Sequence, residues 1–151
     1  SASIFIASAA VADWRPAQAA DQKLKKDGSG GTGGGVPQLS FVENPDILAT
    51  IAQSPRGKQG LAGEGIGVKG GLFCVGFAAE SENLLVNAQA KRLRKGIPLL
   101  VGNIGPATFG QDDNTLLLVD ETKVKELPRA SKRELAKQLV ADIAARLGQA
   151  T

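Results

Sequence analysis

LFCVGF at residues 72–77 decides the fold, because a short run without charged side chains is typical of a strand that is buried on both faces of a sheet. Three further runs repeat this composition: SIFIAS at 3–8, PLLVG at 98–102 and TLLLVD at 115–120. All are rich in leucine, isoleucine, valine or phenylalanine. We therefore expect four buried strands.

Helices are expected between these strands. Residues 81–95 favour a helix that ends at Gly96, with basic side chains in its last turns. The run NPD at 44–46 is typical of a helix start, with Asn44 as the N-cap and Pro45 as the first helical residue. Such a start offers backbone N–H groups to an anion.

The last helix has the clearest pattern. Ser131 and Glu134 form a capping box, and Gly148 marks the end. Between them, apolar residues recur at every fourth position, at Leu135, Leu139, Ile143 and Leu147.

Strands that alternate with helices imply an α/β, three-layer, Rossmann-like domain with a mostly parallel sheet, here a single domain over 1–151. Ligands in such folds bind at the carboxyl ends of the strands. Those ends fall at residues 9–13, 77–80 and 103–105.

Two glycine-rich stretches interrupt the pattern. Residues 16–38 contain a lysine cluster and the run GSGGTGGG at 28–35, a composition that predicts a mobile lysine/glycine loop. Residues 57–71 form the second stretch and include GIGVKG at 65–70, which matches a dinucleotide-binding pattern. That pattern should follow a strand and open a helix, whereas here it precedes a strand. We interpret it as a turn, which argues against a dehydrogenase cofactor domain.

Composition excludes several classes of protein. The chain of 151 residues has no histidine, and Cys74 is its one cysteine, so it cannot build a Ser-His-Asp or Cys-His centre, a histidine-ligated metal site or an internal disulfide. A net charge of +3 with 4% aromatic residues does not suit a nucleic-acid binder. The first apolar run is neither a signal peptide nor a membrane span, and we expect a soluble cytoplasmic protein. The chain has no methionine, which predicts a processed or truncated piece.

Two basic clusters have two interpretations each. Lys91 and Lys95 lie one helical turn apart, so they either form a solvated helix end that complements the dipole or converge on a polyphosphate. The cluster of Lys23, Lys25 and Lys26 is either a solvated charge run or a lid that closes over a charged ligand.

Six blocks in register resemble phosphopantothenoylcysteine synthetase, the coenzyme A pathway ligase that is often the C-terminal half of a bifunctional flavoprotein. The blocks are SAAVADWRP (8–16), KLKK (23–26), ENPDIL (43–48), VGFAAE (75–80), AKRLRKG (90–96) and FGQDDN (109–114). The resemblance covers nearly the whole chain.

The resemblance implies a CTP-dependent enzyme, assisted by Mg²⁺, that activates 4′-phosphopantothenate as an acyl-cytidylate and then lets L-cysteine displace CMP. Such chemistry suits a chain without histidine, because positioning and charge neutralisation catalyse it. The resemblance assigns Lys23 to catalysis on the lid, Lys91 and Lys95 to the triphosphate, and Phe77 to nucleotide placement. The remaining implied nucleotide contacts are Ala7, Ser8, Ala9, Asp13, Pro45, Asp46, Ile47 and Leu48.

The resemblance also implies a homodimer. The segment around Trp14 is then either subunit interface or site. Family members carry a further amino-terminal segment with a glycine-rich strand turn, which does not precede Ser1, so we expect activity of the complete protein. Fusion to or association with a decarboxylase half is implied, and no FMN is expected in this segment. The alternative is a non-catalytic nucleotide-binding or assembly module, which would release no pyrophosphate.

Overall fold

The computed structural model describes residues 2–8, 11–22, 39–61, 71–80, 82–104 and 110–148. They fall into two compact units, one formed by residues 1–10 with 47–151 and the other by Val11–Asp46. Of the loop predicted over 16–38, residues 23–38 lie outside the described residues, as does the GIGVKG run at 65–70, so the mobility of the lysine/glycine segment and the turn at 65–70 stay untested. Pro16, at the start of the predicted loop, is instead the last residue of a short strand.

The first unit is built on a five-stranded sheet of order β1-β4-β5-β6-β7. Neighbouring strands are parallel from β1 to β5, and β6 is antiparallel to β5 and to β7, so every strand except β6 runs in one direction. This confirms the predicted α/β class with a mostly parallel sheet. The strands are β1 (Ile4–Ala7), β4 (Phe73–Glu80), β5 (Leu99–Ile104), β6 (Asp113–Val119) and β7 (Val124–Ser131).

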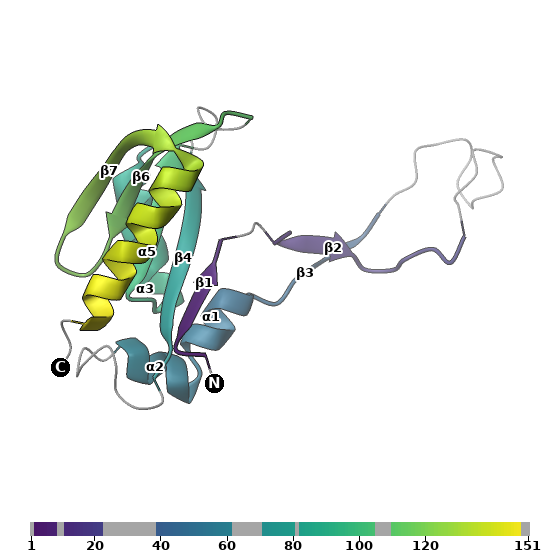
Figure 1. Ribbon diagram of the computed structural model, residues 1–151. Coiled ribbons are helices and arrows are strands. Elements are labelled where there is room, and N and C mark those ends of the chain that lie inside the picture. The colour runs from purple at the N-terminus through teal and green to yellow at the C-terminus, as the bar shows by residue number, and fades with distance from the viewer. Residues whose placement is uncertain are drawn as a thin grey trace. The chain divides into compact units, whose positions relative to one another are not determined.

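Helices cover both faces of this sheet. On one face, α5 (Lys132–Gly148) packs its predicted apolar positions against β4, β5, β6 and β7, and Figure 1 shows α5 lying across the sheet. The other face is covered by α1 (Ile47–Ala52), α2 (Pro55–Leu61) and α3 (Leu84–Lys95). The Ser131 hydroxyl accepts a hydrogen bond from the Glu134 amide at 3.2 Å, as an N-cap does. No helix in the described part of the chain is both long and apolar enough to cross a bilayer.

Helix α2 was not expected from the sequence, because its glycines predicted a loop. Gly57 and Gly60 are helical, and both are buried. A Cβ atom at residue 57 would clash with the carbonyl oxygen of Ala52, and one at residue 60 with that of Leu72. Glycine therefore serves here to let α2 pack directly on neighbouring backbone.

An ionic network joins α5 to the turn between β6 and β7. The Arg146 guanidinium donates from Nη1 to Asp120 Oδ2 at 2.8 Å and from Nε to Asp142 Oδ2. Lys125 Nζ donates to the other oxygen of Asp142 at 2.8 Å. The side chains of Arg146, Asp120 and Asp142 are only 15%, 11% and 10% exposed. This ion-pair network is therefore largely removed from water.

The second unit contains a two-stranded antiparallel ribbon, which we call the arm. It pairs β2 (Trp14–Pro16) with β3 (Phe41–Glu43), and Trp14 lies opposite Glu43. Both strands are exposed along their whole length. The sequence did not predict them, because short exposed strands lack the apolar run that marks a buried one.

Candidate nucleotide site

The carboxyl edge of the sheet leaves part of β4 unpaired. β1 pairs with β4 as far as Ala7, opposite Gly76, whereas β4 continues alongside β5 as far as Glu80. Beyond Gly76, no described strand pairs with β4 on the β1 side. Backbone N–H and C=O groups on such an edge need hydrogen-bond partners and can read the edge of a planar base.

Several predicted nucleotide residues meet at this edge. Gly76 lies opposite Ala7, and a Cβ atom at Gly76 would lie 2.7 Å from Leu48 Cδ2, so α1 packs closely on β4 beside the end of β1. Phe77 follows on the opposite face of β4 and packs partly against the α5 side of the core. Exposed Ser8 comes directly after β1. The structure thus brings Ala7, Leu48 and Phe77 to one end of the sheet.

Lys91 and Lys95 lie in the second half of helix α3. Helix α3 begins after the carboxyl end of β4 and ends at Gly96, shortly before the amino end of β5. At 1.5 Å per residue, Lys91 lies about 10 Å and Lys95 about 16 Å along the helix from its first residue. Along α3, Lys91 therefore lies closer than Lys95 to the helix start that follows the carboxyl end of β4.

The start of α3 was not singled out by the sequence. Asn83 is the N-cap with φ 49°, and its side chain makes no capping hydrogen bond. The Asn87 side-chain amide donates to the Glu82 carbonyl at 3.0 Å and to Glu80 Oε2 at 3.3 Å, which ties the end of β4 to the start of α3. The order of a strand ending in VGFAAE and a helix starting soon after is the signal that points to this loop.

On the arm, Asn44 does not cap a helix, which corrects the sequence prediction. Helix α1 begins at Ile47, and the Asn44 side chain instead donates to the carbonyl of Ala12 at 2.7 Å. The Asn44 amide donates to the carbonyl of Asp13 at 2.8 Å. Asn44 therefore satisfies its own hydrogen-bonding groups across the arm. Pro45 lies in the segment that leads to α1 and not in the helix itself.

The remaining predicted site residues lie in the second unit, at the start of α1 or outside the described residues. Asp13, Pro45 and Asp46 are exposed residues of the second unit, and Ile47 is the first residue of α1. Lys23 and Ala9 lie outside the described residues.

Cys74 is not suited to act as a nucleophile. It is a buried residue of β4, and burial raises the pKa of its thiol, so the reactive thiolate is disfavoured. Within the described residues, no group of three or more acidic, histidine or cysteine side chains could hold a metal ion.

Comparison with known proteins identifies the family. The family described as DNA/pantothenate metabolism flavoprotein C-terminal domain matches residues 1–147. This chain belongs to that family. Only the residues after 147 lie outside the part of the chain that matches the family.

Relatives in this flavoprotein C-terminal domain family include the coenzyme A biosynthesis bifunctional protein CoaBC of Vibrio cholerae, 35% identical over 136 residues, or 88% of this chain and 30% of the relative. CoaBC of Escherichia coli K12 is 36% identical over 142 residues, which are 92% of this chain and 31% of the relative. The chain thus spans about a third of the length of these relatives.

The fold agrees with a solved structure from the same family. The crystal structure of the C-terminal domain of a CoaBC protein matches with a TM-score of 0.64 and 23% identity, over 97% of this chain and 55% of that one. The likeness shows that this chain shares the Rossmann-like α/β fold of that domain.

Proposed function

We propose that this chain is part of a CTP-dependent phosphopantothenate–cysteine ligase of coenzyme A biosynthesis. The observation that carries the proposal is the family match over residues 1–147, together with relatives that are named for coenzyme A biosynthesis. The open edge of β4 beside the end of β1 supports it, because this is where an α/β fold offers a nucleotide site.

In the proposed reaction, a carboxylate oxygen of 4′-phosphopantothenate attacks the α-phosphorus of CTP, and pyrophosphate leaves. The amine of L-cysteine then attacks the carbonyl of the acyl-cytidylate, loses a proton and expels CMP. The backbone edge after Gly76 and the Phe77 side chain position the nucleotide, with Ala7 and Ser8 beside them. Lys23 neutralises charge at the reacting phosphate and carboxylate, which is how most catalysis of phosphoryl attack arises.

Mg²⁺ belongs to the same proposal. The described residues do not form an all-protein metal site, and Mg²⁺ is commonly bound by nucleotide phosphates with one or two carboxylates. We therefore assign no step to the ion.

Pyrophosphate release tests the proposed function. The complete protein is expected to release pyrophosphate from CTP only when 4′-phosphopantothenate is present, and to form the cysteine adduct when L-cysteine is added. A coupled phosphate assay and mass spectrometry of the product measure the two steps. Release with ATP and not with CTP would refute the nucleotide assignment. Release without the acid would refute the acyl-cytidylate, and no release at all would favour a non-catalytic nucleotide-binding module.

Homodimerisation through the arm is a second part of the proposal. By their register, Trp14, Pro16, Phe41 and Glu43 share one face of the ribbon, and Trp14 and Phe41 are 60% and 56% exposed. An isolated two-stranded ribbon is marginally stable in water. Pairing with the same face of a second copy would cover these aromatic side chains, and we assign the Trp14 segment to this interface.

The Trp14→Arg variant tests this interface. Buried tryptophans at interfaces commonly contribute about 2 kcal/mol or more, so we expect the dimer dissociation constant to rise at least about tenfold. Val140 is a matched control, because it is 59% exposed on α5, and Val140→Arg is expected to leave the constant unchanged. Sedimentation equilibrium measures both. Equal dissociation constants for wild type and Trp14→Arg would contradict the arm as the interface.

A further inference from the structure

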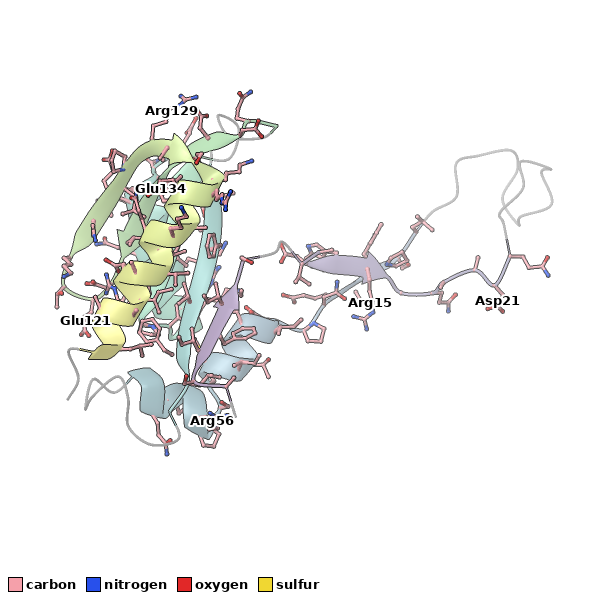
Figure 2. The ribbon with its side chains drawn as sticks, in the orientation of Figure 1. Arg15, Asp21, Arg56, Glu121, Arg129 and Glu134 are labelled. Carbon is pink, nitrogen blue, oxygen red and sulfur yellow. The ribbon has the colours of Figure 1, made fainter. Side chains whose placement is uncertain are left out.

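Asn44 and Arg15 form a set of hydrogen bonds at the base of the arm, which we call the clamp. The Asn44 side chain donates to the Ala12 carbonyl at 2.7 Å and accepts from Arg15 Nη1 at 2.8 Å. Arg15 Nη1 also lies 3.4 Å from the Glu43 carbonyl oxygen, and the Asn44 amide donates to the Asp13 carbonyl at 2.8 Å. Figure 2 shows Arg15 on the arm.

The clamp lies where the chain enters and leaves the second unit. That unit spans Val11–Asp46, so Ala12 is next to its first residue and Asn44 is close to its last. Between them, β2 and β3 are paired over only three residues each, at Trp14–Pro16 and Phe41–Glu43. So short a ribbon holds its ends weakly, and the clamp adds contacts at the end that contains Asp13.

We propose that Asn44 is a positioning residue for nucleotide binding: through the clamp, it holds Asp13 close to the segment that leads to Pro45 and Asp46 before the nucleotide arrives. This inference rests on the proposed function, because Asp13 is there a nucleotide contact. A binding segment that is already ordered costs less conformational entropy on binding. Asn44 itself touches no substrate in this proposal and acts through the backbone of Ala12 and Asp13.

The side chains of the clamp can be removed separately. Asn44→Ala deletes the acceptor for Arg15 and the donor to Ala12, whereas Arg15→Met deletes only the arginine's hydrogen bonds and keeps its aliphatic length. Arg129→Met is a matched control, since Arg129 makes an exposed ion pair with Asp113 on β7 and β6. Its loss leaves the clamp intact.

Two measurements on the complete protein test the inference. First, hydrogen exchange without nucleotide should be about tenfold faster over residues 11–16 in Asn44→Ala, and unchanged in Arg129→Met. Second, steady-state kinetics should show a KM for CTP raised about tenfold in Asn44→Ala and less in Arg15→Met, with kcat within about twofold of wild type. The effects of the two substitutions should be less than additive in the double variant, because the shorter hydrogen bond of Arg15 is the one to Asn44.

The outcomes separate this inference from the proposed function. If the complete wild-type protein uses CTP but Asn44→Ala keeps the wild-type KM or the wild-type exchange rate, the positioning role is wrong and the function stands. A lower kcat or a lower melting temperature in Asn44→Ala, without a rise in the KM for CTP, would also overturn the positioning role. If the wild-type protein releases no pyrophosphate from CTP, the proposed function fails, and the role of Asn44 in nucleotide binding fails with it.

Discussion

Arg146→Met is expected to lower the free energy of unfolding by about 2–4 kcal/mol. Removing one partner of a largely buried ion pair leaves the other charge without compensation, and such losses commonly cost about 3–5 kcal/mol when burial is complete. Here the variant leaves two carboxylates, those of Asp120 and Asp142, only 11% and 10% exposed and without the guanidinium. Methionine preserves the aliphatic volume, so the effect reports on the charge and its hydrogen bonds. Urea unfolding followed by circular dichroism measures it.

Arg129→Met is the control for this prediction. Arg129 donates two hydrogen bonds to Asp113, at 2.9 and 2.8 Å, but the side chains are 68% and 42% exposed, and Figure 2 shows Arg129 at the surface. Exposed ion pairs contribute little, because water screens them. We therefore expect Arg129→Met to leave stability nearly unchanged. Equal losses for the two variants would show that burial of the Arg146 network contributes nothing.

The loss in Arg146→Met should also depend on pH. Burial by itself raises the pKa of Asp120 and of Asp142. Hydrogen bonds outweigh this effect: Asp120 accepts from Arg146 and from the Lys123 amide, and Asp142 accepts from Lys125 and Arg146. The pKa values of both carboxyl groups are therefore lowered. A carboxyl group with a lowered pKa in the folded protein stabilises it above the unfolded pKa of about 3.9, and this contribution is lost as the pH falls through the folded value. The difference between wild type and variant should therefore be full at pH 7 and shrink below about pH 4. A difference that stays constant down to pH 2 would contradict the ionic origin.

Lys23→Gln is expected to lower kcat/KM for the complete ligase by about ten- to hundredfold. Glutamine keeps the polarity and much of the length of lysine but lacks the charge. If Lys23 stabilises charge that grows as the carboxylate attacks the α-phosphate, its loss should cost about 1.5–3 kcal/mol in the transition state. Stability should not change if Lys23 serves catalysis and not folding. Steady-state kinetics with CTP and 4′-phosphopantothenate, together with thermal unfolding, measure both quantities.

Lys91→Gln and Lys95→Gln are comparison variants that separate nucleotide binding from catalysis by Lys23. A triphosphate is fully charged before the reaction, so lysines that hold it should mainly raise the KM for CTP. Because Lys91 lies one turn closer to the start of α3 than Lys95, its variant should show the larger rise. An unchanged kcat with lowered thermal stability in Lys23→Gln would make Lys23 a structural residue and would refute its catalytic role.

Buried elements could be predicted from the sequence because their patterns are local. The runs at 3–8, 72–77, 98–102 and 115–120 all became strands, with ends displaced by a few residues at most. The expected burial was wrong for β1, which has no fully buried residue because it lies at the edge of the sheet. Strand β7 was missed, because VKELPRAS buries only Leu127 fully and so lacks a continuous apolar run. As an edge strand of an antiparallel pair, it faces water along most of its length.

The candidate site could be predicted only in part. A strand end recognised in the sequence predicts which residues reach the carboxyl edge of the sheet. Ala7 and Phe77 do lie there, on strands of the same sheet. The distance of Lys95 from that edge follows from the direction and length of α3, which the spacing of two lysines does not reveal. The role of Asn44 was mistaken because NPD satisfies the local sequence rule for a helix start, whereas the hydrogen-bond partners of Asn44 lie on a distant segment.

The sequence by itself determined which apolar runs become strands of the sheet, the α/β class, and the family to which the blocks at 8–16, 43–48 and 75–80 belong. Only the tertiary structure decided the partners of the polar side chains. Asn44 bonds to Ala12, which is 32 residues away, and Arg146 bonds to Asp120, which is 26 residues away. The physical reason is range: burial and capping preferences act over a few neighbouring residues, whereas hydrogen bonds and ion pairs between distant segments form only after packing has brought those segments together.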